Sequence, residues 1–486
     1  MTKLSIFPSS LSTARSFTTV LSRENLKQHA IDCGALKRER KFSMPDYILS
    51  SLTQMCKSTE KSEFTLSFVH KAYLKFCKKV GKALISHKCI HKQLQSENFL
   101  EVIKCMLSEL MTASYGNSFL KKIKKFISGD LNALLVQLGV DDIILIDGTE
   151  IDLSYSCADN FDCKGKGRPH IDGTPARPGL KLHVAFSLLK QSFVYVEITE
   201  AVGSERDSVL VDRFDNCLII CDRGYVDEEL EQRINESSNL YLIRGKLSTA
   251  ATIDKAIDDN GNVISKFKGK RVNKLPAHAN ADLDVTFTSG HKCRVIVRYN
   301  ANSTDDDKRS ILRTNIPRDR LGGKQIFLLY RVRWAIELFN KANKRSNCLK
   351  SINSANENII LSFILLSLAV SVIKTFTGLK CVIGNKLEWI SMLKLHKQND
   401  SFEELFKALL YRKLSTVYQI FKELLDEITL LCQRTKPSNR DAVNLKDLPS
   451  LIWQIINQPN PSAKIASGLG YAFDFFILSL LLSKNQ

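Results

Sequence analysis

The stretch FLLYRVRWAIELFNKANKR, residues 327–345, is the most informative part of this chain. It carries four chemically distinctive side chains, at Tyr330, Arg333, Glu337 and Lys344. On one continuous α-helix these positions fall within an arc of roughly 60°, so the side chains would share one stripe. A carboxylate among cations is also common on a solvated helix. The stripe therefore needs support from other carboxylates in the chain.

Two upstream aspartates supply that support. Asp147 follows the apolar run 142–146 and precedes Gly148, and Asp222 follows the apolar run 218–221. Each pattern predicts a buried strand with a carboxylate at its C-terminal end, although either aspartate taken alone is more often a turn residue or a helix cap than a metal ligand. Together with Glu337, the two aspartates could converge on divalent cations, which prefer oxygen ligands.

The spacing of Tyr330, Arg333, Glu337 and Lys344 resembles the Tyr-Arg-Glu-Lys signature of the insertion-sequence-four family of bacterial DDE transposases. The blocks Asp147-Gly148-Thr149 and Asp222-Arg223-Gly224-Tyr225 agree with it, and the resemblance runs from about residue 35 to about residue 375. It implies an α/β fold with an RNase H-like catalytic core, a mixed sheet with helices. It also implies a transposase that binds terminal inverted repeats and performs cut-and-paste DNA cleavage and strand transfer.

The same resemblance implies roles for individual residues. The catalytic and metal-binding triad would be Asp147, Asp222 and Glu337, holding Mg²⁺, for which Mn²⁺ could substitute, and two ions would serve in-line phosphoryl transfer. Arg333 and Lys344 would hold phosphates beside the scissile bond, and Lys341 joins the same surface. Tyr330, placed with them among the DNA-binding residues, would pack or hydrogen-bond to the backbone one turn away. The partners would be transposon-end DNA and target DNA, with a homodimer in the synaptic complex.

Sequence patterns predict four regions. Residues 1–130 read as a basic helical DNA-binding region, with helices over 65–77, 86–94 and 97–112. Residues 131–243 and 327–375 would form the catalytic core, interrupted by a β-rich insertion over 244–326. Residues 376–486 read as a helical C-terminal region that could dimerise.

The net charge of +19 favours a polyanionic partner such as nucleic acid. Residues 1–130 hold 22 Lys and Arg against 10 Asp and Glu. Residues 71–92 contain no acid, and Ser86 could cap a helix there. This basic stretch predicts either a helix-turn-helix or an amphipathic helix pair with a solvated basic face. Its expected DNA contacts are Lys78, Lys79, Lys82 and Lys88.

Other features bound the interpretation. Thirteen scattered cysteines without a CxxC pair indicate reduced thiols and no zinc site, as in a cytoplasmic, nucleoid-associated protein. The apolar run 359–373 is about 15 residues long, shorter than the roughly 20 that span a bilayer, so a buried helix is expected and no membrane partner. The insertion has no Trp to stack on an extruded base, so formation of a DNA hairpin is not predicted from a Trp. Phe267, Phe287 or Tyr299 would have to stack on the base instead.

Two other functions fit the same residues. A catalytically inactive, transposase-derived protein would bind DNA ends without cutting them. An RNase H-like nuclease would cut without joining.

Overall fold

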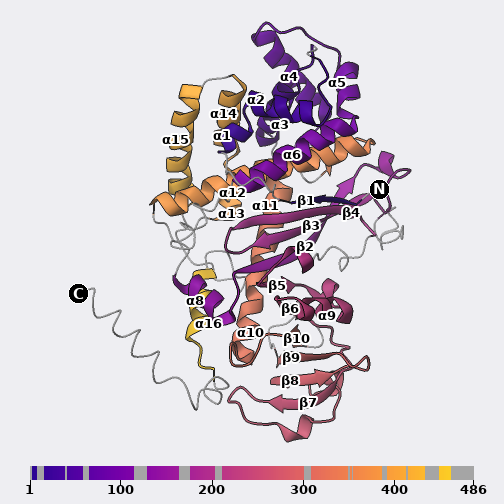
Figure 1. Cartoon of the computed structure of the whole chain (residues 1–486), viewed down its shortest axis with the longest axis vertical. Coiled ribbons are helices and arrows are strands. Elements are labelled where there is room, and N and C mark those ends of the chain that lie inside the picture. The colour runs from indigo at the N-terminus through magenta and orange to yellow at the C-terminus, as the bar shows by residue number, and fades with distance from the viewer. Residues whose placement is uncertain are drawn as a thin grey trace, which may run out of the picture. The chain divides into compact units, whose positions relative to one another are not determined.

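The computed structural model describes residues 3–7, 16–38, 41–57, 65–113, 129–163, 176–202, 211–299, 308–347, 351–352, 354–385, 391–411, 414–432 and 448–460. The chain divides into two compact units, each built from segments distant in sequence. The first unit comprises Met1–Ser128, Leu145–Ser208 and Trp334–Asp447. The second comprises Gly129–Ile144, Val209–Arg333 and Leu448–Gln486. Both contain strands and helices, which confirms the α/β class (Figure 1).

The first unit contains most of the helices (Figure 1). Its helices are α1 (Phe17–Val20), α2 (Arg23–Asp32), α3 (Met44–Lys57), α4 (Leu66–Lys79), α5 (His87–Leu94), α6 (Glu97–Ala113), α11 (Trp334–Ser346), α12 (Glu357–Asn385), α13 (Met392–His396), α14 (Asn399–Leu410) and α15 (Leu414–Cys432). Its strands are β1 (Leu4–Ile6), β2 (Asp142–Leu153) from Leu145 onward, β3 (Gly179–Ser187), β4 (Ser192–Glu200) and β11 (Ser351–Ile352). A 3-10 turn, η1, covers Tyr155–Cys157.

The sheet of the first unit has the order β1-β4-β3-β2. β4 pairs antiparallel with both β1 and β3, and β11 pairs parallel with β2. Phe339 of α11 packs against Phe186 and Phe193, with ring centroids 5.2 and 5.7 Å apart. These contacts seat the helix that carries Glu337 on the sheet.

Helix α12 forms the centre of the helical part. It packs against α6, which lies beside it in Figure 1, and against α15, α13, α3 and β4. Residues Glu357–Cys381 are long and apolar enough to cross a membrane, but their most apolar window is completely buried within the protein. The expectation of a buried helix is confirmed. The expectation of a stretch too short to span a bilayer was wrong, because the helix continues through 374–381.

The N-terminal helices agree with their sequence patterns. The three predicted segments correspond to α4, α5 and α6. Ser86 caps α5 as expected, because its Oγ accepts a hydrogen bond from the backbone N–H of Cys89 at 3.3 Å. These helices and α14 of the C-terminal region belong to one compact unit, and α14 packs on α3. The four-region division by function stays a prediction.

The second unit contains a sheet that begins with two parallel strands and continues with antiparallel ones (Figure 1). Its helices are α8 (Gly129–Leu138), α9 (Glu228–Glu236), α10 (Gly323–Tyr330) and α16 (Leu448–Asn457). Its strands, besides the start of β2, are β5 (Cys217–Cys221), β6 (Leu240–Arg244), β7 (Thr252–Ile257), β8 (Ala281–Thr286), β9 (Lys292–Tyr299) and β10 (Arg309–Thr314). Its 3-10 turns are η4 (Val211–Arg213), η5 (Arg223–Tyr225), η6 (Ser265–Phe267), η7 (Val272–Lys274) and η8 (Arg331–Arg333).

The strand order in this unit is β5-β6-β10-β9-β8-β7. β5 and β6 are parallel, and the remaining pairings are antiparallel. The hairpin expected at Ser289-Gly290 is confirmed, since β8 and β9 pair with Val285 opposite Cys293. Gly290 has φ +87°, which favours a glycine at this turn. Strands β7, β8, β9 and β10 all lie within 244–326, the range in which the sequence pattern predicts strands.

Two local expectations were wrong. Tyr330 ends α10, and η8 separates it from α11, so the signature does not lie on one continuous helix. No Gly or Pro marks this break, and helical periodicity alone therefore could not reveal it. Asp147 lies inside β2 rather than at its end. The alternation at 150–153 extends the strand, and Asp147 instead marks where continuous burial stops.

Candidate active site

The first unit brings Asp147 together with helix α11. Asn340 of α11 donates from Nδ2 to Oδ2 of Asp147 at 2.9 Å, across 193 residues of sequence. Glu337 lies three residues before Asn340, in the first turn of the helix, so both project from one helical face. Asp147 and Glu337 are half-buried and Asn340 is buried. The first unit thus carries two of the three predicted carboxylates and a buried amide that contacts one of them.

The two predicted lysines of α11 differ in exposure. Lys341 is exposed and Lys344 is half-buried. They lie four and seven residues after Glu337, which places them on the same helical face as the carboxylate. Glu337, Lys341 and Lys344 therefore share one face of α11.

Asp222 belongs to the second unit, directly after β5, as predicted. Its Oδ1 accepts a hydrogen bond from the backbone N–H of Gly224 at 2.8 Å and caps η5. Oδ1 of Asp222 therefore caps a turn, which is one of the roles that the sequence pattern allowed for this residue. Asp222 has a second carboxylate oxygen, so capping and metal binding are compatible.

Tyr330 and Arg333 also belong to the second unit, close to Asp222. The Arg333 guanidinium lies 5.9 Å from the centre of the Tyr330 ring, consistent with the eclipsing of residues three apart in a 3-10 turn. Burial raises the pKa of Tyr330 to about 12, while the charges of Arg333 and Arg244 oppose this rise and that of Asp222 adds to it. The hydroxyl of Tyr330 is buried and has no hydrogen-bond partner among the described residues.

Arg244 was not predicted as a site residue. It ends β6, and β6 runs parallel to β5 with Ile243 opposite Cys221. Arg244 and Asp222 therefore lie at the carboxyl ends of two adjacent parallel strands, where ligands commonly bind in open α/β sheets. Arg244 could be identified as a site residue only from the parallel pairing of β5 and β6, which the sequence did not reveal.

The basic stretch of residues 71–92 is mostly exposed, including Lys78, Lys79 and Lys88. Seven residues separate α4 from α5, which is longer than the three or four residues of a helix-turn-helix turn. The helix-turn-helix alternative is not supported. Lys79 already has an aromatic contact, with its Nζ 4.7 Å from the centre of the Tyr411 ring.

Lys82 has a different environment from the other lysines. Its Nζ forms an ion pair with Oδ2 of Asp46, a buried carboxylate of α3 that also pairs with Arg23. Burial favours a higher pKa for Asp46, but hydrogen bonds from Lys82 and Arg23 outweigh it and hold the pKa below its ordinary value. The expectation that Lys82 is free of counter-charge was wrong, because its acid comes from another helix.

The aromatic residues considered for base stacking differ in accessibility. Phe267 is buried in the core of the β-rich segment, and Phe287 packs against that core. Phe287 also lies 4.2 Å from the Arg313 guanidinium. Tyr299 is half-buried and contacts the His278 ring at 4.6 Å between centroids. Phe287 and Tyr299 are both half-buried, and Phe267 is the least accessible of the three to a base.

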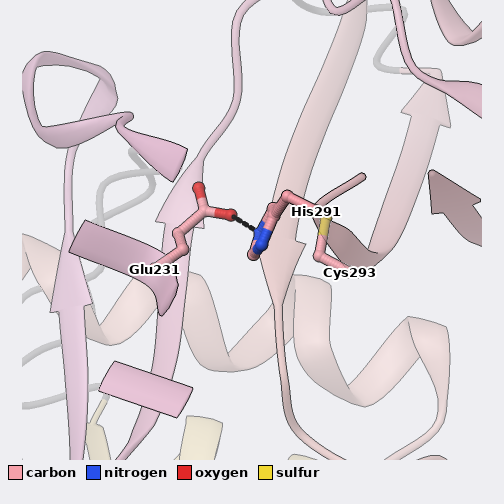
Figure 2. Close-up of side chains that lie close together, drawn as sticks. All are labelled: Glu231, His291 and Cys293. Carbon is pink, nitrogen blue, oxygen red and sulfur yellow. Dashed lines mark hydrogen bonds and ion pairs between the residues drawn. The ribbon is translucent and has the colours of Figure 1, made fainter. Parts of the chain in front are cut away.

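A second polar cluster lies in the second unit (Figure 2). Glu231, His291 and Cys293 present ligand atoms within 4.8 Å of one another, which is a metal-like grouping. However, Oε2 of Glu231 accepts hydrogen bonds from Arg313 at 2.8 Å and from His291 at 3.0 Å. Burial and then the Glu231 charge raise the pKa of Cys293 to about 12, so its thiol stays protonated. Arg313 already supplies the cation, and we interpret the cluster as a buried polar clamp between α9 and the β8–β9 hairpin.

A comparison with protein families matches the part of the chain that contains the three carboxylates. Residues 138–372 match the family model described as a transposase DDE domain. The match covers 235 of the 486 residues and contains Asp147, Asp222 and Glu337. This supports a transposase of the DDE class. No curated protein sequence matches the chain.

A similar solved structure is the cryo-EM structure of a piggyBac transposase synaptic complex with hairpin DNA. The two chains share 11% sequence identity, and the alignment covers 91% of each with a TM-score of 0.41.

Proposed function

We propose that this protein is a DNA transposase of the insertion-sequence-four family that binds the terminal inverted repeats of its element. It cleaves DNA and transfers strands by cut-and-paste transposition. The family match over all three carboxylates is the observation that carries this proposal. The hydrogen bond between Asn340 and Asp147 supports it, because it joins the Glu337 helix to the strand bearing the first aspartate.

The residues fit hard divalent cations. Asp147 and Glu337 in the first unit and Asp222 in the second are half-buried carboxylates, and Mg²⁺ is usually bound by few carboxylates together with substrate phosphate. The buried Asn340 Oδ1 has no hydrogen-bond partner among the described residues, so it could accept a hydrogen bond from a water or ligand bound beside the carboxylates. We propose that the triad holds two Mg²⁺ ions and that Mn²⁺ can substitute.

The remaining signature residues would act on the DNA. Arg333 and Lys344 hold the phosphates beside the scissile bond, and Lys341 contributes charge to the same surface. Tyr330 packs beside Arg333, whose guanidinium lies 5.9 Å from the centre of its ring, and so helps to orient that cation. Arg244 adds a cation close to Asp222. These cations neutralise negative charge that increases during phosphoryl transfer.

The proposed reaction has two steps. In the first, water attacks a phosphodiester at the transposon end, the bond from phosphorus to the 3′ oxygen breaks, and a 3′-hydroxyl and a 5′-phosphate result. In the second, this 3′-hydroxyl attacks a target phosphodiester, so that one ester bond forms as another breaks. The bound divalent ions would activate the attacking oxygen and stabilise the leaving oxygen. An RNase H-like arrangement of the core would serve this reaction.

The proposal extends to partners and location. Lys78, Lys79 and Lys88 would contact end DNA outside the core, because exposed lysines release counterions from the DNA backbone on binding. Two copies would assemble with two ends and with target DNA in a synaptic complex, with dimer contacts from the C-terminal helical region. The protein would act in the cytoplasm, on the nucleoid.

A strand-transfer assay tests the proposal. Purified protein is incubated with labelled DNA from the two ends of its element, a supercoiled target plasmid and Mg²⁺. A transposase both cleaves the ends and joins them to the plasmid. Binding without cleavage would identify a catalytically inactive DNA-binding protein. Cleavage without joining would identify a nuclease.

A further inference from the structure

Asn340 presents two amide atoms with contrasting environments. Its Nδ2 donates to Asp147 at 2.9 Å. Its Oδ1 is buried and has no hydrogen-bond partner among the described residues, and the residue as a whole is only 6% exposed. A buried acceptor without a donor is unfavourable, so the native protein needs a reason to retain one.

The orientation of the amide follows from Asp147. An ionised carboxylate only accepts hydrogen bonds, so the Asn340 group facing it must be the NH₂ donor. The reversed amide would place two acceptors against each other. Oδ1 is therefore directed away from the Asp147 oxygen and needs a donor from elsewhere.

Helix geometry indicates where that donor would be. Glu337 and Asn340 are three residues apart on α11 and share a face. Asp147 and Glu337 are half-buried, whereas Asn340 is buried. The buried amide is thus hydrogen-bonded to one half-buried carboxylate and shares a helical face with the other. A water bound to a cation held by these carboxylates is a strong hydrogen-bond donor, and Oδ1 is the acceptor available to it.

We infer that Asn340 is a positioning residue of the metal site, fixing the Asp147 carboxylate through Nδ2 and accepting a hydrogen bond from a metal-bound water through Oδ1. This inference rests on the proposed function, because it takes Asp147 and Glu337 as metal ligands. Partners that orient metal ligands typically contribute about 10–100-fold to metal affinity.

The test measures Mn²⁺ binding to the full-length protein without DNA, by electron paramagnetic resonance titration. Asn340→Ala should weaken Mn²⁺ binding about 10–100-fold relative to the wild type. Asn343→Ala is the matched control. Asn343 is a buried amide one turn further along α11, and its Oδ1 accepts from Asn347 Nδ2 at 2.8 Å. Its replacement should reduce stability and leave Mn²⁺ affinity unchanged.

Asp147→Ala separates the inference from the proposed function. If the wild type binds Mn²⁺, Asp147→Ala does not, and Asn340→Ala binds like the wild type, the metal site stands and the role of Asn340 is wrong. If the wild type binds no Mn²⁺, or if Asp147→Ala binds it normally, both are wrong.

Asn340→Leu keeps the approximate shape of the side chain and removes both polar atoms, so it gives a second variant if the alanine variant does not fold. Without Nδ2 to fix Asp147 and Oδ1 to accept from the bound water, Mn²⁺ binding should again be weaker than in the wild type. Wild-type Mn²⁺ affinity in this folded variant would overturn the inference.

Discussion

Lys82 and Asp46 form an ion pair that connects the turn after α4 to the first turn of α3. The Asp46 carboxylate is completely buried, while the Lys82 side chain is 43% exposed. The pair therefore neutralises an internal charge from the protein surface. Lys82 therefore has a structural role that its exposed position in the basic stretch does not reveal.

This difference predicts opposite effects of two lysine substitutions. Lys82→Ala should lower the free energy of unfolding by up to about 3 kcal/mol, because a buried carboxylate loses one of its two cations. Lys78→Ala should leave stability unchanged and reduce the salt slope of end binding by about 0.9. Urea unfolding and filter binding at several salt concentrations measure the two effects. An unchanged salt slope in Lys78→Ala and in Lys88→Ala would mean that the stretch is only a solvated face.

Arg244 should matter for catalysis although it lies outside the signature. Arg244→Ala should lower the rate of end cleavage roughly 10–100-fold, the loss expected for one charge-assisted hydrogen bond to phosphate. Arg271→Ala removes an exposed cation from the same unit and serves as the control. Equal cleavage rates for the two variants would contradict a role of Arg244 beside Asp222.

Stability should depend on pH through His183, which is buried on β3 and hydrogen-bonded to Thr199 at 3.0 Å. Burial, assisted by the charges of Lys181 and Lys3, lowers the pKa of His183 to about 3. Between about pH 6.5 and that value the unfolded chain binds a proton that the folded chain does not. The free energy of unfolding should therefore fall as the pH drops, by up to about 1.4 kcal/mol per pH unit from this group.

His183→Gln should make that dependence shallower between pH 4.5 and 6, in urea unfolding at a series of pH values. His278→Gln, at an exposed position, should leave the slope as in the wild type. Identical slopes in all three proteins would show that His183 does not titrate between the two states.

The metal requirement follows from the donor atoms. Oxygen ligands predict activity with Mg²⁺ or Mn²⁺ and inhibition by Ca²⁺. Elemental analysis of the purified protein should find no stoichiometric zinc, because the Arg313 guanidinium already binds Oε2 of Glu231 and supplies the positive charge there. One zinc per chain that disappears in Cys293→Ser would show that the Glu231 cluster is a metal site after all.

Local patterns predicted much of the secondary structure, for local reasons. The Ser86 cap, the strand before Asp222 and the hairpin at Ser289-Gly290 each depend on residues close in sequence, and the structure contains all three. The break after Tyr330 was not predictable in this way, since no Gly or Pro interrupts the helical pattern there.

The missed site features all depend on contacts between distant residues. Asn340 and Asp147 are 193 residues apart, and Lys82 and Asp46 are 36 apart. Arg244 became a candidate only once β6 was seen to pair parallel with β5. Single-sequence patterns identify which residue types occur but not which of them meet.

The central claim is that Asp147, Asp222 and Glu337 are the catalytic carboxylates of a transposase. The most direct test compares Asp147→Ala, Asp222→Ala and Glu337→Ala with the wild type for both binding and cleavage of labelled end DNA in Mg²⁺. Cleavage should be abolished in each variant while band shifts remain nearly normal, because phosphate contacts supply most of the affinity for DNA. Retained cleavage in any one of the three would contradict the claim.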